Sequence, residues 1–242
     1  SGMAIDFLEP VSSRSTIQDG VYRQLRHALM SGHFEPGQTL TIAVLAETFR
    51  TSHMPVREAL RRLTAENALV VVASGSAKVP TVSLAGLNDL CLTRISLETL
   101  AVKLAAARST AEDRRRFAAL MLEHEDAAAE RNLARMLAQN QEFHFAIYDS
   151  CGSAVVVQFI QTLWLRFGPY MRMLSNYIEP LLITGSYTPS SHHRHLVAAI
   201  EAGDARAAAK AVKGDIETTQ DLLRRLCREE VGNSTPKRKK KR

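Results

Sequence analysis

Cysteine is scarce in this sequence of 242 residues, which contains only Cys91, Cys151 and Cys227. Thiols so few and so far apart exclude a disulfide framework and the paired spacing of a zinc finger, and they indicate a reducing cytosol. Long apolar runs are also missing, since none approaches the roughly 18 residues of a membrane-spanning helix. The first ten residues lack the basic segment of a signal peptide. We therefore expect a cytoplasmic protein that does not enter a membrane.

Aromatic residues are few as well, at 6% with a single tryptophan, whereas 45% of the residues are hydrophobic. Alanine, leucine and arginine, which favour helices, are abundant. The sequence therefore predicts a mostly α-helical fold. Its length suits one large domain or two small ones.

A strong excess of one charge is absent from most of the chain. The formal net charge is +6, with 31 basic and 25 acidic residues, but the last six residues, 237–242, are all basic. Without them the two kinds of charge are equal in number. This balance excludes a protein that coats nucleic acid with its whole surface, so a DNA-binding function requires a local site.

The first 82 residues carry alternating helix and strand signals. Apolar spacing, capping residues and turn residues predict three helices and a two-stranded hairpin, at 16–31, 41–49, 52–67, 69–72 and 78–82. Pro55 falls in the first turn of the third helix, where its missing N–H costs nothing. These elements in this order form a winged helix-turn-helix, with Gly75 at the tip of the wing.

The remainder of the chain has helical periodicity almost throughout. Six helices are expected, at 87–108, 111–130, 132–150, 153–174, 190–202 and 204–229. The longest irregular stretch is expected from Asn176 to Pro189. Short connections between the other helices favour an antiparallel bundle. We therefore divide the chain into a winged helix-turn-helix domain (12–82), an all-helical domain (84–231) and a disordered basic tail (232–242), which suits a nonspecific hold on phosphates.

Residues 52–63, Ser-His-Met-Pro-Val-Arg-Glu-Ala-Leu-Arg-Arg-Leu, have the features of a recognition helix. Such a helix needs a polar cap, donors that reach base edges from its first turn, and an apolar back face. Arg57 can read guanine with two hydrogen bonds, and the helix N-terminus can hold a phosphate. The residues predicted to contact DNA are Ser52, His53, Met54, Arg57, Arg61, Arg62, Gly75 and Lys78, with Arg61 and Arg62 assigned to backbone phosphates. The pattern also fits an ordinary amphipathic surface helix.

The stretch from Leu25 to Val82 resembles the GntR family of bacterial transcription regulators. The matching residues are Leu25-Arg26, Gly32, Pro36-Gly37, Leu45-Ala46, Ser52, Pro55-Val56-Arg57-Glu58-Ala59-Leu60, Leu63, Glu66, Leu69-Val70 and Gly75. The resemblance implies that Arg57 and the small polar residues at 52–54 contact an operator.

Three residues depart from the family pattern. Arg50 begins the segment where the family usually has Gly-Val-Ser-Arg, and a turn with positive φ there would cost arginine about 1 kcal/mol. His53 lacks the two-pronged donor of arginine, which implies an unusual operator sequence. Asn67 replaces a glycine, a milder change because asparagine tolerates the left-handed region.

Four residues of the helical domain could hold a metal. Asn140 and His144 are four residues apart on one expected helix and so share a face, while His193 and Asp215 come from two later helices. Imidazole and carboxylate ligands inside a bundle suit zinc, nickel or manganese. From spacing alone, scattered surface groups are the commoner explanation.

The second domain resembles the FCD effector-binding domain of the FadR subfamily. The markers are Arg94-x-x-Leu97-Glu98, Ala101, Leu104-Ala105-Ala106, Phe143-His144, His193, Leu196, Ala199-Ile200, Gly203-Asp204 and Ala208. The resemblance implies a divalent metal held by Asn140, His144, His193 and Asp215, although Asn140 stands where aspartate is commonest and Asp215 where histidine is expected. It also implies small organic acids as effectors.

Two arginines are candidates for the effector's carboxylate. Arg94 could clamp it through a charge-assisted pair, or could instead form a salt bridge to Glu98 one helical turn on. Arg172 is a weaker candidate for the lining of the same site.

The sequence thus predicts a homodimeric transcription regulator, not an enzyme. It would bind a palindromic DNA operator with an affinity set by a small organic acid at a divalent metal. The alternatives are a metal-dependent enzyme acting on a small carboxylate, a metal-free effector-binding regulator, and a helical interaction module with a vestigial site. The enzyme alternative lacks a further acidic residue that could serve as a general base.

Overall fold

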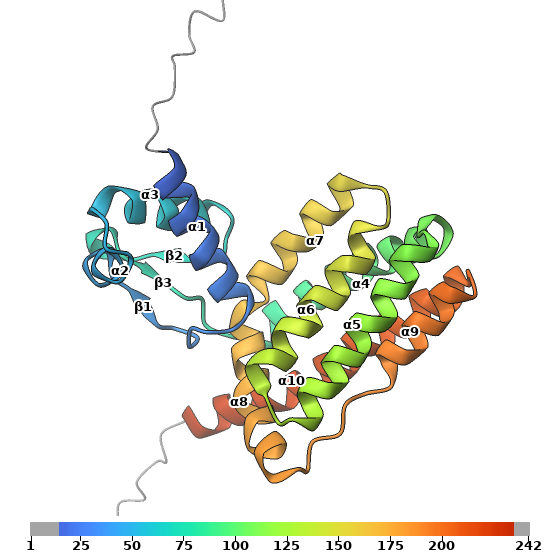
Figure 1. Cartoon of the computed structure of the whole chain (residues 1–242). Coiled ribbons are helices and arrows are strands. Elements are labelled where there is room, and N and C mark those ends of the chain that lie inside the picture. Colours follow the sequence, from blue (N-terminus) through green and yellow to red (C-terminus); the bar gives the residue numbers. More distant parts are fainter. Residues whose placement is uncertain (1–14, 235–242) are drawn as a thin grey trace, which may run out of the picture.

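The structure, a computed structural model, describes residues 15–234. A small N-terminal part lies beside a larger helical bundle (Figure 1). The N-terminal part contains α1 (Ser15–Met30), β1 (Thr39–Leu40), α2 (Ile42–Phe49), α3 (His53–Ala65), β2 (Val70–Val71), the 3-10 turn η1 (Ala73–Gly75) and β3 (Ala77–Lys78). The bundle contains α4 (Leu84–Arg108), α5 (Ala111–Ala129), α6 (Leu133–Asp149), α7 (Ala154–Arg166), α8 (Gly168–Thr184), α9 (His192–Glu201) and α10 (Ala205–Ser234). The mostly α-helical prediction is confirmed.

The N-terminal part is a winged helix-turn-helix whose sheet has three strands, not the predicted two. β1 pairs with β3 and β3 with β2, all antiparallel. β1 is only two residues long, too short to show an alternating pattern in the sequence. Leu40 is nevertheless buried opposite Ala77, its partner in the ladder, so apolar packing fixes the extra strand.

The apolar face of α3 holds this helix against α1. Val56, Leu60 and Leu63 are buried in the same core as Leu25 of α1. The turns on either side of α3 use the predicted left-handed conformations, with φ of 51° at Arg50 and 58° at Asn67. The opposite face of α3 is left at the surface.

The bundle is organised around α4, which packs against α6, α7, α9 and α10. In Figure 1, α5 and α6 run alongside each other, with α7 on one side and α9 on the other. Short loops join most of these helices, as the sequence predicts for an antiparallel bundle.

The expected helix 153–174 is in fact two helices, with the break between Arg166 and Gly168. A Cβ atom on Gly168 would lie 2.1 Å from the carbonyl oxygen of Leu29, so the chain turns at the point where it meets the end of α1. Pro169 follows in the first turn of α8, where proline is tolerated. The break thus arises from a contact with a distant part of the chain, which periodicity alone does not reveal.

The irregular stretch expected from Asn176 to Pro189 is also shorter than predicted. α8 continues through Pro180 to Thr184, and the irregular segment covers only 185–191. An internal proline costs a helix about 3 kcal/mol. Burial of Ile178 and Leu182 on either side of the proline offsets this cost.

α10 extends to Ser234, beyond the predicted start of the tail at residue 232. A single Gly232 costs about 1 kcal/mol, too little to stop a long helix that is already formed. The rest of the predicted tail, 235–242, and residues 12–14 of the predicted first domain lie outside the described residues. Among residues 15–234, no helix combines the length and apolar character needed to cross a membrane.

Candidate functional site

The first turn of α3 presents its polar groups to solvent. Ser52 caps the helix in an extended conformation, and its hydroxyl makes no hydrogen bond to the helix. His53, Met54 and Arg57 are exposed, while Val56 on the same turns is fully buried. The N–H groups of this turn and three predicted contact residues therefore lie on one accessible surface.

The tip of the wing approaches this surface. Gly75 has a φ of 78°, and a Cβ atom there would lie 3.3 Å from Nη1 of Arg57. The structure thus brings Gly75 and Arg57 together, and glycine allows both the turn and the close approach.

The other predicted DNA contacts are differently placed. Arg61 is exposed, and among residues 15–234 its ion-pair partner is the neighbouring Glu58, at 3.5 Å. Arg62 instead turns toward α1, where it lies 3.7 Å from Asp19 and stacks 3.7 Å above the ring centroid of Tyr22. Its guanidinium therefore joins α1 to α3, and its contact with a DNA phosphate stays a prediction. Lys78 is half-buried in the central strand, away from the tip of the wing.

The bundle encloses a cavity of about 330 Å³. Helices α4 to α8 and α10, the start of α9 and the loop after α8 line it. Its lining residues are Arg94, His124, Met136, Leu137, Asn140, His144, Trp164, Phe167, Met171, Leu174, Tyr177, Ile178, Tyr187, Thr188, Ser190, His193, Asp215, Ile216, Thr218, Thr219, Leu222 and Arg225. All four predicted metal-binding residues are among them.

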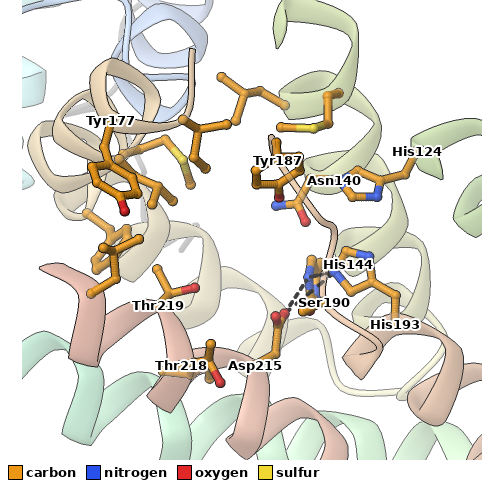
Figure 2. Close-up of a pocket in the computed structure, with 18 of the residues that line it drawn as sticks. His124, Asn140, His144, Tyr177, Tyr187, Ser190, His193, Asp215, Thr218 and Thr219 are labelled. Carbon is orange, nitrogen blue, oxygen red and sulfur yellow. Dashed lines mark hydrogen bonds and ion pairs between the residues drawn. The ribbon is translucent and has the colours of Figure 1, made fainter. Parts of the chain in front are cut away.

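Three of those four side chains meet at one end of the cavity (Figure 2). Nε2 of His144 lies 3.1 Å from Nε2 of His193 and 3.3 Å from Oδ2 of Asp215, and His193 lies 3.6 Å from the same oxygen. We call these residues the His-His-Asp cluster. It is built by α6, α9 and α10, while Asn140 lines the cavity one turn before His144.

A buried hydrogen-bond chain fixes the orientation of His144. The Tyr148 hydroxyl donates to Oε1 of Glu98 at 2.6 Å, so its oxygen is left to accept from Nδ1–H of His144 at 3.2 Å. This pattern leaves the lone pair of His144 on Nε2, facing the cluster. Such a partner behind a ligating histidine sets its tautomer and its orientation.

Glu98 anchors this chain and is itself fully buried. It accepts hydrogen bonds from Nε of Arg94 at 2.7 Å and from Nε1 of Trp164 at 3.1 Å. Arg94 therefore lines the cavity, but with its charge already paired to Glu98. Of the two roles left open for Arg94, the salt bridge is the one present.

The cluster carries one negative charge. Burial alone would raise the pKa of Asp215, but its close contacts with the imidazoles of His144 and His193 outweigh burial and hold that pKa well below its ordinary value. Burial also lowers the pKa of His144, which keeps the imidazole neutral. An ionised carboxylate and an imidazole lone pair thus face each other at 3.3 Å, and a cation between them would relieve their repulsion.

This donor set fits a divalent metal. The three ligand atoms all lie within 4.8 Å of one another, and no larger group of this kind occurs among the described residues. Two neutral imidazoles and a carboxylate are the ligands that zinc, nickel and manganese accept.

His124 of α5 also lines the cavity and was not predicted from the sequence. Its ring centroid lies 4.9 Å from that of His193, and burial, followed by the two neighbouring imidazoles, lowers its pKa to about 4. Its spacing from Phe117, Leu120 and Met121 puts it on the apolar stripe of α5, which is the signal that could have revealed it.

Arg172 is the predicted site residue that the structure places elsewhere. Its Nε pairs with Oε1 of Glu35 at 2.6 Å, in the turn after α1, and it does not line the cavity. The break at Gly168 shifts the helical phase, so Arg172 faces the N-terminal part. Arg225 of α10, not anticipated from the sequence, lines the cavity and has no hydrogen bond or ion pair with any described residue.

An exposed recognition helix with a wing, joined to a bundle that encloses a polar cavity, defines a DNA-binding transcription regulator. Residues 17–79 match the model of the bacterial regulatory proteins of the gntR family, and residues 89–218 match the FCD domain. The chain therefore belongs to the GntR family of transcription regulators that carry an FCD domain.

Comparisons with individual proteins agree with this assignment. The chain is 33% identical to the HTH-type transcriptional regulator McbR of Escherichia coli over 160 residues, 66% of this chain and 72% of that protein. It is 28% identical to the transcriptional repressor GlaR of Escherichia coli over 214 residues, 86% of this chain and 96% of that one. The solved structure of E. coli McbR/YncC superimposes with a TM-score of 0.78 at 26% identity, covering 90% of this chain and 99% of that one. These relatives are regulators, so this protein is a regulator and not an enzyme.

Proposed function

We propose that this protein is a bacterial, cytoplasmic transcription regulator whose affinity for a palindromic operator is controlled by a small organic acid. Residues 12–82 would bind DNA, and residues 84–231 would bind the effector and form the dimer. The observation that carries the proposal is the His-His-Asp cluster, within 4.8 Å, inside a cavity of the FCD domain. When bound there, a divalent metal would supply the positive charge that attracts the acid's carboxylate.

The exposed apolar residues support a homodimer. Leu92 and Leu100 of α4 and Val155 and Phe159 of α7 are all more than two-fifths exposed, and α4 packs directly against α7. Four large apolar side chains on two adjacent helices are typical of a surface that a partner covers. A twofold dimer would place two recognition helices on the two halves of a palindrome.

Helix α8 is the element through which we propose that the cavity acts on the DNA-binding part. Its residues Met171, Leu174 and Ile178 line the cavity. At its other side, Gly168 abuts the carbonyl oxygen of Leu29, and Arg172 pairs with Glu35. A ligand that binds one position of α8 better than another would therefore bias the orientation of α1 and α3.

Operator binding by an Arg57→Ala variant tests the proposal. DNA selected from a random pool by the zinc-loaded protein would be labelled, and its affinity measured by fluorescence anisotropy. We expect a loss of about tenfold or more, since one two-pronged guanine contact contributes roughly 1–3 kcal/mol. Thermal unfolding of the bundle should not change. The matched control is Arg115→Ala, an exposed arginine of α5.

Two results would contradict this assignment. Equal operator affinity for the Arg57→Ala variant and the parent would remove α3 from the DNA interface. Failure of the purified protein to retain zinc, nickel or manganese, with no chelator-induced change in melting temperature, would leave a metal-free regulator.

A further inference from the structure

We infer that the effector is a monocarboxylic acid with an unbranched apolar body of about eight bonds, and not a sugar acid or another polyhydroxylated acid. The inference rests on the proposed function, because it takes the cavity of the FCD domain as the effector site.

The cavity has one polar end and one apolar end. Along α6, the lining residues run from His144 through Asn140 to Leu137 and Met136. Met136 precedes His144 by eight residues, a separation of about 12 Å along the helix axis. Met136 and His144 both line the cavity, so the cavity changes from polar to apolar along its length.

Helix α10 shows the same gradient. Asp215 belongs to the His-His-Asp cluster, Thr218 and Thr219 follow one turn later, and Leu222 comes a further turn along. Asp215 and Leu222 are about 10 Å apart along the axis. In Figure 2, Tyr177 of α8 lies across the cavity from the cluster, near the apolar end.

The apolar end offers few partners to a hydroxyl group. Met136, Met171, Leu174, Ile178 and Leu222 line it without a strong donor or acceptor, and Tyr177 adds a single hydroxyl. A sugar acid placed there would bury most of its hydroxyl groups without hydrogen bonds. An alkyl chain would replace water in the same space with favourable contacts, and the two methionines would adapt to its shape.

The length of the apolar end sets the length of the ligand. An extended chain advances by about 1.2 Å per bond, since a three-bond peptide unit spans about 3.6 Å. A body that reaches about 10 Å from the cluster therefore has about eight bonds. Octanoate meets this description.

Arg225 does not alter the inference that the body of the ligand is apolar. It is exposed, and its position ten residues beyond Asp215 puts it past Leu222, at the far end of the row on α10. A cation in that position attracts any acid, whatever its body. Because Arg225 is exposed, an ion pair with a second carboxylate there would contribute at most about 1 kcal/mol, or about fivefold in affinity. Moving that carboxylate from water to a site beside Leu222 would cost more, so the dicarboxylic acid of the same length is an informative competitor.

The fluorescence of Trp164 reports binding directly. Trp164 is the only tryptophan in the chain, and it lines the cavity. The zinc-loaded full-length protein would be titrated with octanoate, with octanedioate and with gluconate. We expect saturable binding of octanoate, at least tenfold tighter than that of either other acid. Equal or tighter binding of gluconate or octanedioate would overturn the inference.

Two substitutions test the apolar end itself. Leu222→Asn and Met171→Gln place an amide in the apolar end with little change in volume, and each should weaken octanoate binding about tenfold. Leu122→Asn, at an exposed position of α5 outside the cavity, should leave it unchanged. Unchanged octanoate binding in both cavity variants, each with parental melting behaviour, would refute the role of these residues.

The failure of this inference is distinguishable from failure of the proposed function. Operator affinity measured with and without saturating octanoate provides the separate readout. Tight octanoate binding with no change in operator affinity would contradict effector control and leave the ligand class standing. Release of the operator by gluconate would support effector control and overturn the inferred ligand class.

Discussion

The hydroxyl of Tyr148 provides the sharpest test of how the site is built. Substitution of Tyr148 by phenylalanine keeps the fully buried ring and removes one oxygen. That oxygen makes two hydrogen bonds, to Glu98 at 2.6 Å and to Nδ1 of His144 at 3.2 Å. Without it, His144 is free to exchange its tautomer and to present an N–H, not a lone pair, to the His-His-Asp cluster.

The expected magnitude follows from the position of Tyr148 behind a ligand. Loss of the partner that orients a ligating histidine costs about 10- to 100-fold in metal affinity. At saturating zinc, a hundredfold weaker site would lose about 2.7 kcal/mol of metal-induced stabilisation. The apoprotein should also lose about 1.5–3 kcal/mol, because the hydrogen bond to the Glu98 carboxylate disappears. Glu98 keeps its bonds to Arg94 and Trp164, so the bundle should still fold.

Zinc competition against a chromophoric chelator would measure the affinity, and thermal unfolding with and without chelator would measure the stabilisation. The matched control is Tyr170→Phe. Tyr170 is also buried, but its hydroxyl bonds to the backbone of Ser83, outside the cluster. The control should lose stability without losing zinc affinity. A folded Tyr148→Phe protein that binds zinc within twofold of the parent would refute the reasoning.

The remaining predictions concern the two proposals for coupling and dimerisation. Glu35→Gln removes the charge that pairs with Arg172, so the effector-induced change in operator affinity should shrink while effector affinity, read from Trp164 fluorescence, stays constant. The pair is exposed, so the free energy of unfolding should change by less than about 1 kcal/mol, and an undiminished response would exclude the pair from coupling. Phe159→Asp should convert the dimer to a monomer, as measured by light scattering, and weaken operator binding at least about tenfold. The control is Leu122→Asp, at another exposed apolar residue but on α5, which should change neither property. A dimeric Phe159→Asp protein would move the interface away from α7.

The recognition helix was predictable because its signals are local. The cap at Ser52, the proline in the first turn and the apolar back face all lie within a dozen residues. The left-handed turns at Arg50 and Asn67 follow from the same short-range pattern. Nothing outside the segment is needed to infer which face of the helix is exposed.

The cavity depends instead on contacts between distant segments. His144, His193 and Asp215 stand out by residue type, but the chain from Glu98 through Tyr148 joins helices 50 residues apart and leaves no local trace. The misplacement of Arg172 has the same origin. The turn at Gly168 is set by its contact with Leu29, and without that turn the helical phase carries Arg172 to the wrong face.

Asn140 stands where the family pattern has aspartate, and Asp215 stands where it has histidine. The cavity offers a physical explanation for these two departures. Related domains are expected to carry the carboxylate on α6, at the position of Asn140. That position lies between the cluster and the apolar residues Leu137 and Met136, where the carboxylate of an incoming acid would sit. Two carboxylates about 4 Å apart repel by roughly 4 kcal/mol at the dielectric typical of such sites. Placing the charge on Asp215 instead would keep one carboxylate for a bound metal, and the neutral amide of Asn140 would be able to donate a hydrogen bond to the acid. The exchange would therefore favour an acid that approaches along α6, from the apolar end of the cavity.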